Sequence, residues 1–197
     1  MSVKNSVNIF LATTLAIFLQ TEDLRAEELL SVQNALAMAF PDSDSVKQRV
    51  IVASISQKEK LKGLIGKKKK STLFRYYEGL RENGCDGYAI IDKVKGKHGS
   101  ITFMVILDPE LTVRRVDILQ FREQRGRPVS RRRFLSQFRG KNSSDPIRLH
   151  VDIHGVTGAT ISSRAVISGV RSVLSHAAVL IPRDELNLPD RILQDNS

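Results

Sequence analysis

The chain has 197 residues, of which 41% are hydrophobic, enough for one packed domain of ordinary size with additional segments. Its formal net charge of +10 predicts an anionic partner: a nucleic acid, an anionic membrane surface or a phosphate-bearing ligand. Because Cys85 is the single cysteine, an internal disulfide and a metal centre built by cysteines are excluded. Neither a zinc-ligand spacing nor an aromatic-rich RNA-binding signature is present, so we do not expect a nucleic acid partner.

The first 26 residues have the pattern of an export signal. Lys4 precedes a largely apolar run over residues 7–19, which is too short to span a bilayer comfortably, and Ala26 offers a small residue for cleavage. We therefore expect residues 1–26 to be a signal peptide, with an uncleaved membrane anchor as the alternative. The protein would then work in the periplasm or at the outer face of the cytoplasmic membrane.

Residues 27–72 are predicted to form an N-terminal extension of helix, strand and helix. The first helix has apolar residues at helical spacing and stops at Pro41. The β-branched residues of 46–55 predict a strand. Ser56 is expected to cap a short second helix that ends at Gly66.

A series of strands is predicted next. Four apolar or aromatic runs, separated by turn residues, cover residues 72–80, 87–94, 100–107 and 113–121. Successive strands with short connections predict an antiparallel meander. A helix with Ser130 as its cap and Gly140 as its stop follows, and a strand is expected over 147–153. The predicted fold class is therefore α+β, an antiparallel sheet packed with helices.

The stretch from His154 to Ser163 holds two glycines and five hydroxyl or imidazole side chains, and an apolar segment with helical spacing follows it. We expect a turn that opens a helix, with Thr157 or Thr160 near the N-cap and with the helix ending at Pro182. The N-terminus of a helix readily binds a phosphate. On the residues alone, an ordinary turn and helix cap remain an alternative, since any helix start favours glycine and hydroxyls.

The sequence Thr157-Gly-Ala-Thr160, with Ser163 three residues on, resembles the flavinylation motif of the FMN-binding domain family. This domain occurs in the C and G subunits of sodium-pumping and Rnf-type oxidoreductases and in small exported flavoproteins. The resemblance implies that a flavin transferase links FMN, through its phosphate, to Thr160. It also implies cofactor contacts from nearby residues: His154, Thr157, Gly158, Ala159, Ile161, Ser162, Ser163 and the loop residue Glu123.

The resemblance covers about residues 74–180, so an FMN-binding domain is expected over 73–181, followed by a flexible tail over 182–197. Within it, the segment from Phe134 to Lys141 is similar to the helix that follows the flavin loop in the family. One position departs from the family pattern. The family usually has an aspartate three residues before the motif, where this chain has His154, and the nearest aspartate here is Asp152.

The resemblance implies an extracytoplasmic electron-transfer flavoprotein whose partners are a flavin transferase and extracytoplasmic or membrane redox proteins. No residues for substrate catalysis or metal binding are evident, so we expect a redox carrier without a substrate of its own. Three arginines, Arg122, Arg125 and Arg164, are candidates for raising the reduction potential of the flavin, although for each one alone an ordinary exposed position is favoured. Two alternatives remain open: a module or sensor that holds FMN without a covalent bond, and a cofactor-free protein that contacts an anionic membrane surface through residues 67–70 and 131–133.

Overall fold

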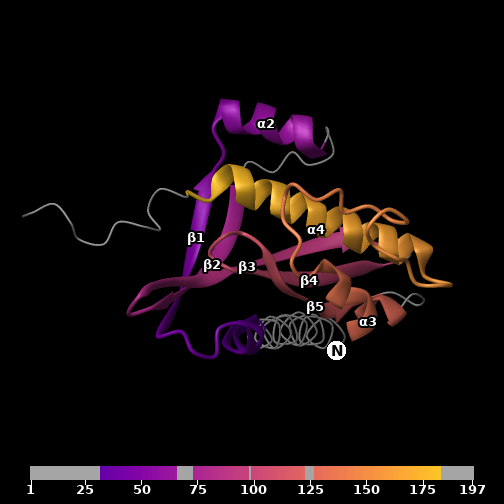
Figure 1. Cartoon of the computed structure of the whole chain (residues 1–197), viewed down its shortest axis with the longest axis horizontal. Coiled ribbons are helices and arrows are strands. Elements are labelled where there is room, and N and C mark those ends of the chain that lie inside the picture. The colour runs from indigo at the N-terminus through magenta and orange to yellow at the C-terminus, as the bar shows by residue number, and fades with distance from the viewer. Residues whose placement is uncertain (1–31, 66–72, 98, 123–126, 183–197) are drawn as a thin grey trace, which may run out of the picture. The chain divides into compact units, whose positions relative to one another are not determined.

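The computed structural model describes residues 32–65, 73–97, 99–122 and 127–182 of the chain, and of Arg127 the backbone alone (Figure 1). The chain divides into two compact units, residues 1–38 and residues 39–197. The described part of the first unit is helical, and the helix runs to residue 39, as expected for the helix that stops at Pro41. The predicted signal peptide, the second-helix stop Gly66 and the predicted tail beyond residue 182 lie outside the described residues.

The second unit contains a five-stranded sheet whose strands follow one another in chain order. These strands are β1 (Ser45–Val52), β2 (Leu73–Arg81), β3 (Gly84–Lys95), β4 (Ser100–Leu107) and β5 (Val113–Phe121). Every neighbouring pair is antiparallel, so the predicted meander and the α+β class are confirmed. Strand β1, which the sequence analysis placed in the N-terminal extension, is hydrogen-bonded to β2 and is therefore part of the same sheet.

The long helix α4 (Thr160–Leu180) lies along one face of this sheet, and α2 (Ile55–Ile65) packs against α4 (Figure 1). The apolar stripe of α4 that contacts the sheet is buried and includes Val166, Val170 and Val173. At Gly169 the two layers approach so closely that an added Cβ would lie 2.6 Å from the Phe103 ring. The helix ends at the residue before Ile181, as the position of Pro182 predicted. In the part of the chain that the structure describes, none of the helices combines the length and the apolar character needed to cross a membrane.

The caps of two helices differ from the sequence expectation. At α2 the capping residue is Ser54 rather than Ser56, because the Ser54 hydroxyl accepts the Gln57 N–H while the Gln57 side chain accepts the Ser54 N–H. The helix expected from Ser130 is only one α-turn, α3 (Arg132–Leu135), and its N-cap is Arg131 without a side-chain cap. Two 3-10 turns flank it, η2 (Arg127–Ser130) and η3 (Ser136–Phe138).

The strand predicted over 147–153 is wrong. Its apolar residues alternate as in a strand, but the segment is a loop with one isolated bridge between Leu149 and Ile153. The Asp152 carboxylate holds this loop by accepting the N–H groups of Ile147 at 3.1 Å and Arg148 at 2.7 Å. A side chain thus replaces the neighbouring strand as the partner of these amides.

Candidate functional site

Thr160 is the first residue of α4, and its side chain is exposed. Both Thr157 and Thr160 lie near the helix start, as expected, but the N-cap itself is Ala159, which provides no side-chain cap. Gly158 precedes it with a φ of +76°, in the left-handed region that favours glycine, and an added Cβ there would meet nothing within 4 Å. The start of α4 is therefore an open corner that lacks the usual capping hydroxyl.

The two serines of the motif lie underneath this corner. Ser163 is completely buried, and its hydroxyl accepts the Val156 N–H at 3.1 Å. Ser162 is also buried, with 3% of its surface exposed. Because Ser163 binds the backbone of the turn, its hydroxyl supports the turn from the helix side instead of facing the solvent at Thr160.

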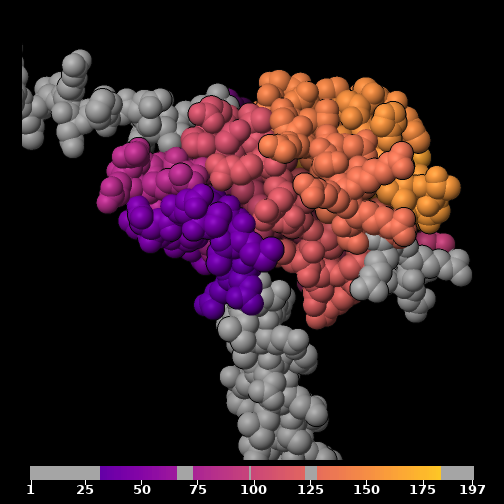
Figure 2. Space-filling view, turned by 60° about the horizontal axis from the view of Figure 1, so that its bottom comes forward, coloured from indigo at the N-terminus to yellow at the C-terminus, as the bar shows by residue number. Residues whose placement is uncertain are grey.

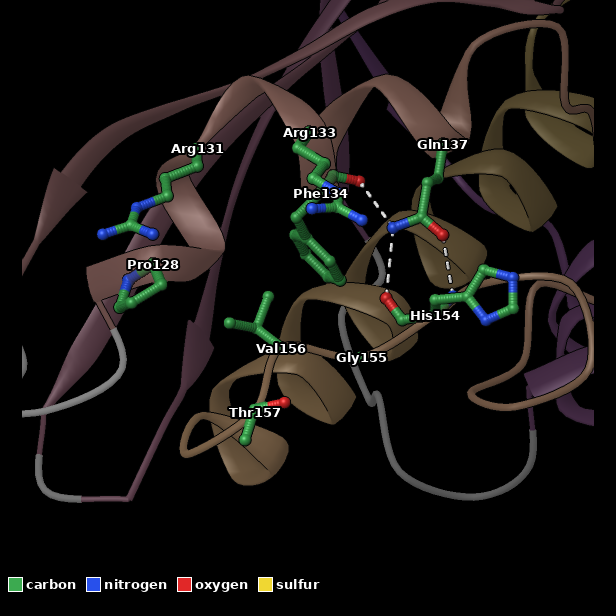
Figure 3. A pocket seen from close by; sticks show the side chains of 9 residues that line it. All are labelled: Pro128, Arg131, Arg133, Phe134, Gln137, His154, Gly155, Val156 and Thr157. Carbon is green, nitrogen blue, oxygen red and sulfur yellow. Dashed lines mark hydrogen bonds between the residues drawn. The ribbon is translucent and has the colours of Figure 1, made fainter.

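A second side chain holds the same turn from the opposite side. Gln137, in η3, accepts the His154 N–H at 2.7 Å through Oε1 and donates to the His154 carbonyl oxygen at 3.1 Å through Nε2 (Figure 3). The His154 side chain itself is exposed. Gln137 was not among the residues predicted to form the site. Its position within residues 134–141, the segment similar to a helix of the family, was the one feature of the sequence that pointed to it.

A cleft of about 620 Å³ lies between these two segments (Figure 3). Its volume is within the roughly 300–1,000 Å³ typical of ligand pockets. Phe134 and Val156 contribute apolar surface, while Arg131 and Arg133 bring two guanidinium groups. The complete lining is Pro128, Arg131, Arg133, Phe134, Gln137, His154, Gly155, Val156 and Thr157.

The expected cofactor contacts are therefore brought together only in part. His154 and Thr157 line the cleft, whereas Gly158, Thr160 and Ile161 are exposed at the helix start and do not line it. Ala159 is buried as the N-cap. Glu123 and Arg125 lie outside the described residues. Of the three candidate arginines, Arg122 and Arg164 are exposed and do not line the cleft, whereas Arg131 and Arg133 do.

Asp152 does not take the place of the aspartate that the family usually has at position 154. Its carboxylate is bound to two backbone N–H groups and lies 2.9 Å from the Lys141 ammonium. Burial alone would raise the pKa of Asp152, but the Arg148 N–H and Lys141 outweigh it, so the pKa is lowered. The carboxylate of Asp152 therefore stabilises the loop that leads into the motif.

Cys85 is not a reactive thiol in this arrangement. It lies half-buried in β3, and its Sγ donates to the Gly87 carbonyl oxygen at 3.6 Å. Burial raises the pKa of the Cys85 thiol above its ordinary value, which keeps it protonated. Cys85 also does not line the cleft.

The residues around the open corner fit the phosphate end of FMN. The first-turn amides of a helix have no earlier helical carbonyl as a partner, and the partial positive charge of the helix end attracts an anion. Ala159 supplies no competing cap, and the cleft next to Thr157 is large enough for an aromatic ring system.

Comparison with known proteins agrees with this assignment. Residues 96–175 match the family described as FMN-binding domain. FMN binding is therefore the function class of the protein. The chain is also similar to the crystal structure of NqrC from Shewanella oneidensis, with 17% identity and a TM-score of 0.48 over 65% of this chain and 77% of that one. Among curated proteins no match was found.

Proposed function

We propose that this protein is an exported electron-transfer flavoprotein that carries FMN on Thr160 through a phosphoester bond. The observation that carries the proposal is the position of Thr160: an exposed hydroxyl on the first residue of a 21-residue helix, beside a cleft of suitable size. A residue to be modified by another enzyme must be accessible, and the phosphate that it receives must be stabilised where it is attached.

The attachment is a phosphoryl transfer to Thr160 Oγ1. The flavin donor must carry a leaving group on phosphorus, as the pyrophosphate of a flavin dinucleotide does. The new Oγ1–P bond forms as the P–O bond to the nucleoside monophosphate breaks, and the proton of the Thr160 hydroxyl passes to a base of the transferase. Gly158, Thr160 and Ile161 are all exposed, so this corner is accessible to a transferase.

After attachment, the residues of the chain hold and tune the cofactor. The amides of the first turn of α4 bind the phosphate. Phe134 and Val156 offer an apolar wall to the ring system, and Arg131 and Arg133 favour its anionic reduced form. FMN supplies the electron-carrying chemistry when bound, and the protein supplies orientation and electrostatics.

The same proposal implies a cellular location and a set of partners. The signal pattern of residues 1–26 supports export to the periplasm or the outer face of the cytoplasmic membrane. A covalent bond retains the cofactor where dissociated flavin would be lost. The required partners are a flavin transferase and extracytoplasmic or membrane redox proteins.

Co-expression with a flavin transferase tests the covalent bond. The denatured wild-type protein should keep its flavin fluorescence on a gel, and the intact mass should increase by one FMN phosphoester. Thr160→Ala should abolish both signals, whereas the matched variant Thr112→Ala, outside both the motif and the cleft, should retain them. Colour that disappears on denaturation would instead support the non-covalent module, and a colourless protein that binds anionic vesicles would support the membrane-contact alternative.

A further inference from the structure

The surface around the cleft has an uncompensated positive charge. Residues 127–182, which form one continuous part of the surface in Figure 2, contain nine arginines and lysines against two aspartates. One of these aspartates, Asp152, is already paired with Lys141. Nine cations against two aspartates leave this segment with a surplus of seven positive charges, which favours an anionic partner.

Four of these arginines flank the candidate flavin site. Arg131, Arg132 and Arg133 are exposed on the η2–α3 segment that forms one wall of the cleft. Arg164 is exposed on α4, one helical turn after Thr160. We call these four residues the arginine rim.

We propose that the arginine rim is the docking surface for an acidic redox protein, which exchanges electrons with the flavin in the cleft. This inference rests on the proposed function, since an electron carrier without a substrate must meet its partner where its cofactor is accessible. Guanidinium groups suit the carboxylates of an acidic protein because they form bidentate hydrogen bonds with them.

The neighbouring exposed residues favour a protein over a lipid surface. Ile161, which follows Thr160 at this corner, is an exposed apolar side chain with 48% of its surface accessible. A single apolar side chain among arginines is not the broad apolar face that inserts into a lipid surface. A membrane-binding helix would instead present a continuous apolar face, but α4 turns its apolar stripe toward the sheet, and α3 has only four residues.

The test uses the full-length flavinylated protein and an acidic plant-type [2Fe–2S] ferredoxin as the probe. The reduced ferredoxin, with a low potential of roughly −400 mV, is mixed with the oxidised flavoprotein in a stopped-flow instrument. Each ferredoxin gives one electron, so two reduce one flavin, and protons come from the solvent. We expect a second-order rate constant that falls steeply as the salt concentration rises.

The charge-removing variant is Arg132→Gln/Arg164→Gln, because neither residue lines the cleft. It should lower the low-salt rate constant about tenfold, the lower end of typical electrostatic steering. The matched control Lys58→Gln/Lys60→Gln removes the same charge from exposed positions of α2 and should change the rate less than twofold. Equal losses in both variants would show that only net charge matters and would overturn the proposal.

Binding measured without electron transfer separates this inference from the proposed function. Calorimetry with Thr160→Ala, which lacks the attachment residue, should still detect salt-sensitive binding of the oxidised ferredoxin. If wild type carries no covalent flavin but this binding persists and requires Arg132 and Arg164, the proposed attachment fails and the docking surface stands. If Arg132→Gln/Arg164→Gln weakens binding to vesicles containing phosphatidylserine and leaves ferredoxin binding unchanged, the rim binds lipid, and the inference is wrong.

Discussion

Gln137 holds both backbone polar groups of His154, at 2.7 Å for the N–H and 3.1 Å for the carbonyl oxygen. The amide side chain satisfies a donor and an acceptor at once, as a neighbouring strand would. On the other side of the turn, the buried Ser163 hydroxyl binds the Val156 N–H. The segment just before the Thr157–Thr160 motif is thus fixed by two side chains, one from η3 and one from α4.

Gln137→Ala should release this segment. Loss of two partly exposed hydrogen bonds is worth about 1–3 kcal/mol locally, because the His154 groups lose their partners. Hydrogen exchange of the His154 amide should accelerate roughly ten- to a hundredfold, since each 1.4 kcal/mol is a factor of ten. Gln57→Ala, a matched change at the α2 cap, should leave this amide unaffected. Unchanged exchange in Gln137→Ala would mean that the hydrogen bonds do not hold the turn.

Asp152→Asn should destabilise the protein in a pH-dependent way. The folded-state pKa of Asp152 is lowered, so its contribution is complete above the ordinary value of 3.8 and is lost as the pH falls through the folded value. At pH 7 we expect a loss of about 1–3 kcal/mol in the free energy of unfolding, from the hydrogen bonds and the Lys141 pair. Urea unfolding at pH 7 and pH 3 measures the difference between wild type and variant.

The difference in unfolding free energy between wild type and Asp152→Asn should be smaller at pH 3 than at pH 7. Asp145→Asn is a suitable control, because Asp145 accepts a single N–H, that of Asn142, in a neighbouring loop. An equal loss at both pH values would show that the charge of Asp152 does not contribute.

The strands and α4 were predictable because their signals are local. The runs over 100–107 and 113–121 coincide with β4 and β5, since apolar runs bounded by turn residues define a strand well. Helix α4 combines a long apolar stripe with a proline stop, and both signals lie within its own sequence.

The site was predictable only in part because its geometry depends on side chains distant in sequence. The four-residue motif indicated Thr160, but Gln137 binds His154, which is 17 residues away in sequence, and no periodicity encodes such a contact. The loop around Asp152 resembled a strand because alternation alone cannot reveal that a carboxylate occupies the amides. Likewise, Ser54 and Ser56 are equally plausible caps until Gln57 completes the pair with Ser54.

Gly158→Ala should destabilise the protein through backbone strain alone. The φ of +76° is unfavourable for alanine by roughly 1–2 kcal/mol, while the open space around the added Cβ excludes a steric clash. Gly63→Ala is the matched control, because Gly63 lies within α2 and an added Cβ there also meets nothing. It should stabilise the protein by about 0.5–1 kcal/mol. Thermal unfolding of the two variants should therefore shift in opposite directions, and a shared direction would contradict the strain at Gly158.

His154→Asp should accelerate flavin transfer without altering stability. The family usually has an aspartate at this position, and here the His154 side chain is exposed while its backbone is held by Gln137. The substitution therefore leaves the turn intact and changes the group that a transferase meets. A recovered charge-assisted contact of about 1–2 kcal/mol would raise the rate roughly five- to thirtyfold.

The measurement is a time course of fluorescence in the denatured protein band, with purified transferase and a flavin dinucleotide. His150→Asp provides the same change of side chain four residues earlier, at another exposed position. Acceleration in His154→Asp alone would identify position 154 as a recognition position. Equal acceleration in both variants would attribute the effect to local charge, and no acceleration in His154→Asp would show that the transferase does not depend on an aspartate before the motif.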